Sequence, residues 1–415
     1  MNPVFDLVLR NIGVLATPNG KNAKKGDAQG QITLTENAAV GISKGMFAYV
    51  GEDKPLEGER VIDCQGRLVT PGLVDAHTHL VFGGWRQKEM ARKLAGVSYL
   101  DILKSGGGIL ETVRQTRAAC EDELFEKGMR LLSAMLAHGT TTAECKSGYG
   151  LSVEDELKQL QVMKKLNQYS AVDLVPTFMG AHAIPAEYKN DRKAYIDLVC
   201  EQMMPAVIAQ GLAAFCDIFC ETAVFTPEES RYILGKACEL KLIPKAHVDE
   251  INPIGGAEMA AAVGCISAEH LIQASDEGIR ALAECGVIAC LLPATSFHLE
   301  KNFARARDMI AAQVAVAVCT DFNPGSSPNL NLQFPMYLAC HRYKLTPAEA
   351  LTAVTLNGAA AVALSERTGS IEEGKQADAV IWDSPDLDYI FYRYGSNLVH
   401  TVIKNGTPLP VKDAG

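Results

Sequence analysis

The chain has 415 residues, of which 48% are hydrophobic and 21% are charged, and its formal net charge is −10. A chain of this length and apolar content can bury a large core, so we expect one large domain with a smaller one. The acidic balance, without any block of basic residues, argues against nucleic acid or an anionic membrane as a partner.

Targeting signals and cysteines set further limits. The first residues, Met1 to Asp6, lack the charged and apolar regions of a secretory leader, and no apolar run is long enough to span a bilayer. The 12 cysteines are scattered through apolar segments without C-x-x-C pairs or a compact disulfide framework. This pattern is typical of buried thiols in a reducing compartment, so we expect a cytoplasmic protein.

The beginning and the end of the chain have the same sequence pattern, which predicts short strands separated by turns. Strands are predicted over residues 6–9, 38–42, 46–51, 60–63, 379–382 and 400–406. Neither end has enough strand to close a sheet alone, so we expect residues 1–70 and 365–415 to form one composite β-sandwich domain. The polar stretch 18–26 between the early strands predicts a mobile surface loop.

The middle of the chain, residues 71–364, alternates strands with helices. Apolar, β-rich runs predict strands over residues 73–79, 140–147, 173–182, 215–221, 243–250, 267–271, 287–294 and 314–322. Helical periodicity is clear over 121–137, 228–240 and 277–284. Eight strand–helix units over roughly 290 residues indicate an α/β fold of the (β/α)8 TIM-barrel type, whose active site lies at the carboxyl ends of the strands. A doubly wound sheet would instead need a glycine-rich phosphate turn after the first strand.

The first predicted strand ends in His77-Thr78-His79 rather than in such a turn. Side chains two residues apart in a strand point to the same face, so the two imidazoles can approach one ion. Histidines and carboxylates recur where later predicted strands end, as His182, His247, Glu250, His270 and Asp321. Of nine histidines, five lie at four of the eight predicted strand ends. Three imidazoles and a carboxylate suit a zinc or iron ion with one position open for water.

These motifs resemble the amidohydrolase superfamily, and the resemblance covers nearly the whole chain. It rests on Pro-Gly-x-x-Asp-x-His-x-His at residues 71–79, on the histidines of the fifth and sixth strands, and on the aspartate of the eighth. The resemblance implies that the metal ligands are His77, His79, His247 and Asp321, with His270 close by. Binuclear members carry a modified lysine at the end of the fourth strand, whereas residues 219–222 read Phe-Cys-Glu-Thr here. We therefore expect one Zn2+ or Fe3+ ion per chain.

Several loops narrow the resemblance to the imidazolonepropionase family. They are Gly83-Gly84-Trp85-Arg86, the glycines 106–108, Lys146-Ser147-Gly148-Tyr149-Gly150, and Asp321-Phe322-Asn323-Pro324-Gly325-Ser326. Ser326 stands where many members have threonine, which keeps the hydroxyl. The resemblance implies a homodimeric hydrolase of cyclic amides that opens 4-imidazolone-5-propanoate to N-formimidoyl-L-glutamate in histidine degradation. The substrate pocket would be lined by Arg86, Tyr149, His182, Glu250, Asn323, Gly325 and Ser326.

The same resemblance suggests catalytic roles. Glu250 would carry a proton from water to the leaving nitrogen, His270 would stabilise the oxyanion, and Asp321 would be a ligand and second proton acceptor. Arg86 would hold the propionate, because its planar fork suits a carboxylate. The remaining histidines, His138, His298, His341 and His400, are interpreted as structural or solvent-facing.

Two other functions stay open at this point. A deaminase of a cytosine- or guanine-like ring would use the same His-x-x-Glu machinery, but a neutral nucleobase offers no carboxylate to Arg86. A catalytically inactive metal-binding barrel should have lost a ligand or the proton carrier, and all are present here. Glu250 could also be a structural carboxylate paired with a basic neighbour such as Lys146.

Overall fold

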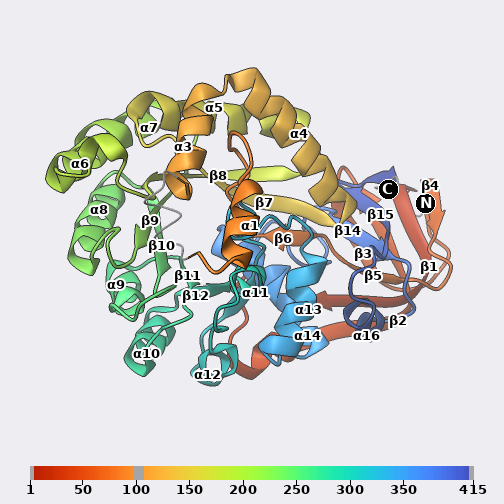
Figure 1. Ribbon diagram of the computed structural model, residues 1–415. Coiled ribbons are helices and arrows are strands. Elements are labelled where there is room, and N and C mark those ends of the chain that lie inside the picture. The colour runs from red at the N-terminus through yellow and green to blue at the C-terminus, as the bar shows by residue number, and fades with distance from the viewer. Residues whose placement is uncertain (1–3, 98–106, 411–415) are drawn as a thin grey trace.

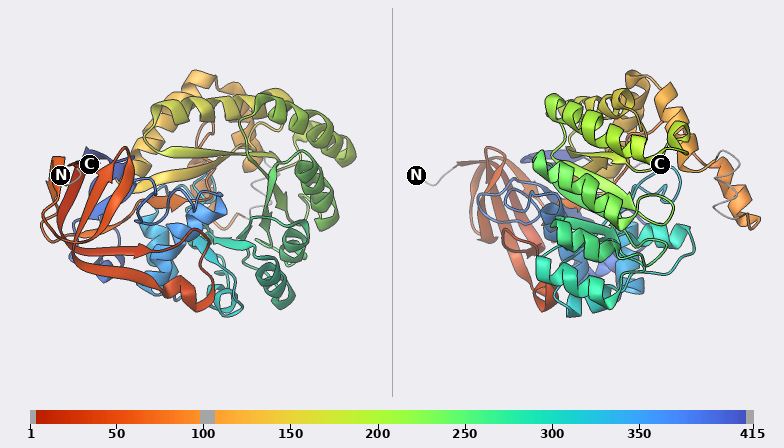
Figure 2. Two further views of the ribbon diagram at one scale, coloured as in Figure 1. Left: turned by 180° about the vertical axis from the view of Figure 1, so that it is seen from behind. Right: turned by 90° about the vertical axis from the view of Figure 1, so that its left-hand side faces the viewer.

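The computed structural model describes residues 4–97 and 107–410. It consists of a nearly closed barrel of eight parallel strands, surrounded by helices, and a second sheet built from both ends of the chain. The red N-terminal and blue C-terminal strands of that second sheet lie together at one side of the barrel (Figures 1 and 2). The TIM barrel with an added β domain is therefore confirmed.

All eight predicted barrel strands are present, with shorter ends. They are β6 (Leu73–Asp75), β7 (Thr140–Lys146), β8 (Asp173–Ala181), β9 (Phe215–Cys220), β10 (Ile243–Val248), β11 (Ser267–His270), β12 (Ile288–Leu291) and β13 (Val316–Val318). Because β6 ends at Asp75, His77 and His79 lie just beyond the strand rather than within it. The barrel closes there through a bridge between Thr78 and Phe322, with the His79 amide donating to the Phe322 carbonyl at 2.9 Å.

Helices cover the outside of the barrel (Figure 2). They are α1 (Lys88–Leu94), α3 (Ile109–Ala118), α4 (Glu121–Ala137), α5 (Val153–Tyr169), α6 (Arg192–Leu198), α7 (Met204–Gln210), α8 (Pro227–Glu239), α9 (Gly256–Val263), α10 (Asp276–Cys285), α11 (Pro293–His298), α12 (Ala306–Ala311), α13 (Gln333–Arg342), α14 (Pro347–Ala353), α15 (Leu356–Ala361) and α16 (Leu387–Tyr392). The helix predicted over 121–137 has the predicted bounds, and α8 and α10 differ from prediction by one residue at each end.

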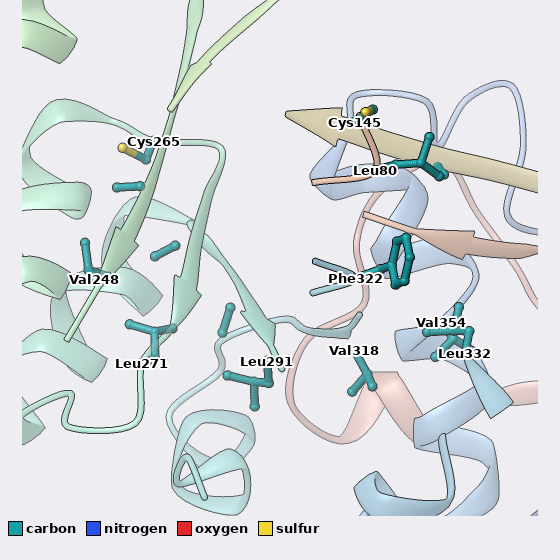
Figure 3. Close-up of a cluster of buried hydrophobic side chains, with 14 of the residues drawn as sticks. Leu80, Cys145, Val248, Cys265, Leu271, Leu291, Val318, Phe322, Leu332 and Val354 are labelled. Atoms are coloured by element: carbon teal, nitrogen blue, oxygen red, sulfur yellow. The ribbon is translucent and has the colours of Figure 1, made fainter. Parts of the chain in front are cut away.

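Apolar side chains from the strands and the surrounding helices form a large core, and a smaller separate cluster joins β6, β12 and β13 to α15. Figure 3 shows part of the large core, with Val248, Leu291 and Val318 of β10, β12 and β13 and with Leu271 and Phe322, which follow β11 and β13. This packing holds the carboxyl ends of the strands at fixed separations. The polar residues that directly follow the strands are therefore held at fixed distances from one another.

The β domain draws its strands from both termini, as predicted. They are β1 (Val4–Pro18), β2 (Ile32–Ser43), β3 (Met46–Glu52), β4 (Glu57–Asp63), β5 (Leu68–Pro71), β14 (Ala379–Trp382), β15 (Val399–Lys404) and β16 (Thr407–Pro410). Their order is β16-β15-β14-β5-β1-β2-β3, with β4 also paired to β1. Apolar residues from β1, β2, β3, β5, β14 and β15 meet in a separate cluster, so the sheet wraps around a core of its own.

The predicted loop over residues 18–26 is present but shorter, at residues 19–25, and its mobility stays a prediction. β1 continues to Pro18, and a short 3-10 helix begins at Gly26. Between them the Lys24 amide donates to Asn357 Oδ1 at 2.7 Å, and the Lys375 ammonium donates to the Gly20 carbonyl at 2.6 Å. Polar residues of this stretch bind partners more than 300 positions away in sequence, which a local polarity pattern does not reveal.

Two other expectations concern the cysteines and the glycine loop. The 12 cysteines are free thiols and most of them are buried, as expected.

In the described part of the chain, no helix combines the length and the apolar character needed to cross a bilayer. Of the predicted glycine loop, Gly106 lies outside the described residues, and Gly108 immediately precedes α3.

The face of the β sheet opposite its own core packs against the barrel. Trp382 of β14 is fully buried in the barrel-side core, and its indole Nε1–H donates to Thr70 Oγ1 at 2.8 Å. This side chain joins the C-terminal strand β14 to β5, which leads directly into β6 and the first histidines.

Trp382→Ala should therefore destabilise the protein by about 3–5 kcal/mol, because it removes a large buried ring. Trp382→Phe should lose less, about 1 kcal/mol for the indole hydrogen bond in addition to reduced packing. Thermal and denaturant unfolding measure both variants. The control is Leu34→Ala, at a position of β2 that is 58% exposed, and equal losses in Trp382→Ala and this control would contradict the account.

Candidate active site

Three buried imidazoles meet at the carboxyl ends of β6 and β10. Ring nitrogens of His77, His79 and His247 all lie within 4.8 Å of one another. His247 Nε2 and His79 Nε2 are 3.3 Å apart, and the His77 and His247 ring centroids are separated by 4.5 Å. The structure thus brings together three of the four residues expected to hold a metal.

Two carboxylates determine which ring nitrogen points inward. His77 Nδ1 is hydrogen-bonded to Glu269 Oε2, and His247 Nδ1 lies 3.1 Å from Asp217 Oδ1. A carboxylate can only accept, so each Nδ1 carries the hydrogen and each Nε2 keeps its lone pair free. Both carboxylates are fully buried. Neither was identified from the sequence.

Asp321 completes the cluster from the segment after β13. Its Oδ1 lies 3.4 Å from His77 Nε2 and 3.7 Å from His79 Nε2. The hydroxyl of Thr295 donates to the other oxygen, Oδ2, at 2.6 Å. Burial raises the pKa of Asp321 to about 6, although the Thr295 hydrogen bond acts in the opposite direction. The carboxylate is thus oriented with one oxygen held by the protein and one facing the imidazoles.

The donor set fits a cation. Among the described residues, His77 Nε2 is buried and has no hydrogen-bond partner. Burial, followed by the charge of Lys146, holds the pKa of His77 well below its usual range, and burial with the His182 imidazole does the same for His79. Neutral imidazole lone pairs beside a carboxylate oxygen are the ligands that zinc and iron accept.

Beneath the imidazoles lies a chain of buried ion pairs. Lys146 Nζ contacts Glu144 at 2.7 Å and Asp217 at 2.6 Å. Lys245 Nζ contacts the same Glu144 at 3.0 Å and Glu269 at 3.4 Å. All five of these residues have no exposed surface. We call this set, Glu144, Lys146, Asp217, Lys245 and Glu269, the buried ion-pair chain.

A sequence signal for the buried ion-pair chain exists. Charged residues stand at alternate positions within otherwise apolar strands, as in Glu144-Cys145-Lys146 of β7 and Lys245-Ala246-His247 of β10. In a barrel, alternate residues face the interior. Charges at such positions are costly unless they are paired, so their period of two predicts partners on neighbouring strands.

Glu250 and His270 lie beside the cluster. His270 Nε2 is 3.6 Å from Glu250 Oε2, and the His270 and His247 ring centroids are 5.3 Å apart. Burial raises the pKa of Glu250 to about 8, with the charges of Asp321 and Glu221 acting in the same direction. Lys146 pairs with Glu144 and Asp217, so the alternative pairing of Glu250 with Lys146 is wrong.

Tyr149 and His182 form one wall next to His79. The His182 ring stacks on His79 with centroids 4.9 Å apart, and Tyr149 lies 5.8 Å from the His79 ring. His182 Nδ1 bonds to the carbonyl of Gly148 at 3.0 Å. Gly148 has φ +100°, and a Cβ there would lie 2.8 Å from His182 Nδ1, so this position requires glycine. Both predicted pocket residues therefore lie at the site.

Arg86 approaches from the loop before α1 and lies against Gly325. A Cβ on Gly325 would fall 2.1 Å from Arg86 Nη1, so glycine is needed for the guanidinium to fit. Glu89 holds the guanidinium through Oε2, at 3.1 Å from Nη2 and 3.2 Å from Nε. The predicted proximity of Arg86 and the loop after β13 is thus present in the structure.

Asn323 shapes that loop from within. Its Oδ1 accepts from the amides of Gly325 and Ser326, each at 2.8 Å. Its Nδ2 donates to Ser326 Oγ at 2.8 Å and to the Asp321 carbonyl at 2.7 Å. Because both Oδ1 and Nδ2 of the Asn323 amide are hydrogen-bonded within the loop, Asn323 influences the pocket by fixing the shape of this loop.

Among the described residues, the remaining histidines are not part of the cluster of ligand atoms. His138 follows α4 as its C-terminal cap, and His400 lies on β15 of the β domain. His298 ends α11 and is exposed, and His341 of α13 contacts the Tyr337 ring with centroids 4.2 Å apart. These positions agree with the expectation for His138 and His400, and a structural or solvent-facing role for His298 and His341 stays a prediction.

Solved structures share this fold. An adenosine deaminase from Xanthomonas campestris with bound zinc is 20% identical, with a TM-score of 0.70 over 99% of this chain and 94% of the deaminase. A 5-methylcytosine deaminase from Klebsiella pneumoniae is 18% identical, with a TM-score of 0.74 over 98% of both chains. At these identities the likeness extends to the fold alone.

Sequence comparison reaches further. Two models of the amidohydrolase family match residues 60–119 and 244–409. The chain is 52% identical over 406 residues to the imidazolonepropionase of Bacillus velezensis, covering 97% of this chain and 96% of the relative. It is 50% identical over 411 residues to that of Alkaliphilus metalliredigens, covering 97% of both. The chain therefore belongs to the imidazolonepropionase family of amidohydrolases.

Proposed function

We propose that the protein hydrolyses the cyclic amide of 4-imidazolone-5-propanoate to N-formimidoyl-L-glutamate, a step of histidine degradation. Relatives named imidazolonepropionase, half identical over nearly the whole chain, support this substrate. One structural observation carries the proposal: a nearly buried arginine, Arg86, lies over Gly325 in the loop that follows the cluster residue Asp321. This arrangement suits a small ring that carries a carboxylate.

Substrate binding would begin at Arg86. Its guanidinium can donate two parallel hydrogen bonds to the propionate, which fixes both the position and the rotation of the ring. Tyr149 and His182 would face the ring from the opposite side, close to His79. The reacting amide would then lie over the imidazole cluster.

His77, His79, His247 and Asp321 would hold one metal ion. When bound, the ion supplies two things: it lowers the pKa of water toward about 7 and it polarises the amide carbonyl. The ligand set fits zinc or ferric iron equally, so we propose either. The fourth strand ends at Cys220 and Glu221 without a lysine, which favours a single ion.

Glu250 would carry the proton. Its carboxylate accepts a proton from water as the water oxygen bonds to the amide carbon, and the carboxylic acid then delivers that proton to the ring nitrogen as the carbon–nitrogen bond breaks. His270 is buried, and burial holds its pKa well below the usual range. A neutral imidazole N–H can still donate to the developing oxyanion. Asp321 is placed to act as a second proton acceptor.

The deaminase alternative has weaker support. The solved deaminases share the fold at no more than 20% identity, and a neutral nucleobase offers Arg86 no substrate carboxylate beyond its existing contact with Glu89. The inactive-barrel alternative would require the loss of a ligand or of Glu250, and the sequence retains each of these residues.

Further proposals follow the family resemblance. We propose a cytoplasmic homodimer, with residues 1–70 and 365–415 as the β domain and 71–364 as the barrel domain. Tyr392 and Tyr394 near α16 are 77% and 64% exposed, and exposed aromatic side chains of this kind are common in subunit contacts.

Loss of the absorbance of freshly prepared imidazolonepropionate tests the function directly. Purified protein should hold one zinc or iron ion per chain by elemental analysis, and should lose turnover after chelation and regain it when the ion is restored. Asp321→Ala should reduce metal content or activity while the melting temperature shows a folded barrel. Two ions per chain at full occupancy, or turnover that survives chelation, would contradict the account.

Arg86→Ala should raise KM with little change in kcat, corresponding to a loss of about 1.5–3 kcal/mol for a charged hydrogen bond. Arg86→Lys should restore only part of the affinity, because an ammonium cannot make the two-pronged contact. Steady-state kinetics with Arg114→Ala as control, a 74% exposed arginine of α3, measures the effect. Unchanged kinetics in Arg86→Ala would favour the nucleobase alternative.

Glu250→Gln should keep the metal content and lower kcat by a factor on the order of 10²–10⁴, because the amide cannot carry the proton. A base acts in its ionised form, so the wild-type rate should rise with pH through the raised pKa of Glu250, and this limb should vanish in the variant. A purely structural carboxylate would instead give a lower melting temperature with most of kcat intact.

A further inference from the structure

The carboxylate of Glu250 has little to hold it directly. Within the described residues, the carboxylate lies 3.6 Å from His270 Nε2, has no lysine or arginine at ion-pair distance, and accepts no hydrogen bond from the protein. Its side chain is only 15% exposed, so water does not freely surround it. The position of this group is therefore set by the backbone on either side of it.

The backbone before Glu250 is fixed by Asp249. Asp249 has a left-handed conformation with φ +50°, which is uncommon for a residue with a side chain. Its carboxylate accepts from the amides of Gly256 at 3.0 Å and Ala257 at 2.8 Å, at the start of α9. The chain thus turns sharply at Asp249 and presents Glu250 to the barrel mouth.

The backbone after Glu250 is held by Glu221, which follows β9 and is 1% exposed. Glu221 Oε2 accepts from the Ile251 amide at 2.8 Å and from the Asn252 amide at 3.3 Å. Its Oε1 accepts from Asn252 Nδ2 at 3.0 Å and from the Thr222 amide at 2.7 Å. Three of these four donors belong to the two residues that directly follow Glu250.

The hydrogen bonds around residue 221 require a carboxylate at this position. Burying an ionised carboxylate is costly unless hydrogen bonds compensate it, and no cation pairs with Glu221 within the described residues. Each oxygen of Glu221 accepts hydrogen bonds from two N–H groups. Both side-chain atoms at these positions must therefore be acceptors. A glutamine would turn an NH2 group toward two N–H donors in either orientation of the amide.

We propose that Glu221 is a positioning residue for proton transfer, which holds the 251–252 backbone so that the Glu250 carboxylate stays beside His270. The inference rests on the proposed role of Glu250 as proton carrier. A shift of about 1 Å in a reacting group can lower the rate on the order of 10²-fold. Hydrogen bonds that fix the backbone of the two residues after Glu250 can therefore control turnover.

Glu221→Gln in the metal-loaded protein should lower kcat about 10–100-fold, with KM for imidazolonepropionate within about twofold of wild type and metal content unchanged. The decisive measurement is a double-mutant cycle. In a Glu250→Gln background, Glu221→Gln should have almost no further effect on kcat, because the group that it positions is already lost. Equal losses in both backgrounds would overturn the proposal.

Two variants keep the test sharp. Asn252→Ala removes one donor to Glu221 and should lower kcat less, about 2–10-fold, again only while Glu250 is present. Glu349→Gln changes another buried carboxylate, which accepts from the Thr346 amide at 2.8 Å at the start of α14, and should affect the melting temperature without changing kcat.

The outcomes separate the two proposals. Wild-type kcat in Glu250→Gln would contradict the proton-carrier role and overturn the inference with it. A low kcat in Glu250→Gln combined with wild-type kcat in Glu221→Gln would overturn the positioning role alone. If Glu221→Gln does not fold, Asn252→Ala decides, and wild-type kcat in that variant would overturn the positioning role.

Discussion

Asp217 and Glu269 determine the chemistry of the site, because each accepts a hydrogen bond from Nδ1 of an imidazole and leaves Nε2 free. An imidazole with its hydrogen on the other nitrogen could not bind a cation at this position. The orientation of His77 and His247 therefore depends on two carboxylates that would not themselves be ligands of the ion. Acceptors behind ligating histidines commonly contribute 10–100-fold to metal affinity.

The two carboxylates are themselves possible only because of the buried ion-pair chain. Lys146 and Lys245 each bridge two carboxylates and share Glu144, so every buried charge has an opposite charge within 3.4 Å. Breaking one such pair leaves an uncompensated charge, which costs about 3–5 kcal/mol. The buried ion-pair chain also joins the strands β7, β9, β10 and β11. Barrel stability and the geometry of the site therefore depend on the same contacts.

Much of this could be predicted from the sequence, because the barrel repeats a strong local signal. Apolar runs alternate with helical periodicity, and α4 has the predicted bounds because it ends in a clear cap at His138. The imidazole cluster follows from the rule that strand ends meet at one face. Partners such as Glu269 for His77, or Glu221 for the Ile251 amide, could not be predicted, since they depend on strand register. The hydrogen-bond partners of the stretch 18–26 could not be predicted for a related reason, because they come from distant segments.

We infer that the Nε2 atoms of three histidines and one oxygen of Asp321 form a single metal site above the buried ion-pair chain. Anomalous diffraction from crystals of the metal-loaded protein tests it most directly. The account predicts one anomalous peak per chain, bonded to Nε2 of His77, His79 and His247 and to Asp321 Oδ1, with Asp217 and Glu269 still on the Nδ1 atoms. A peak coordinated through Nδ1, or a second peak of equal height at the barrel mouth, would contradict it.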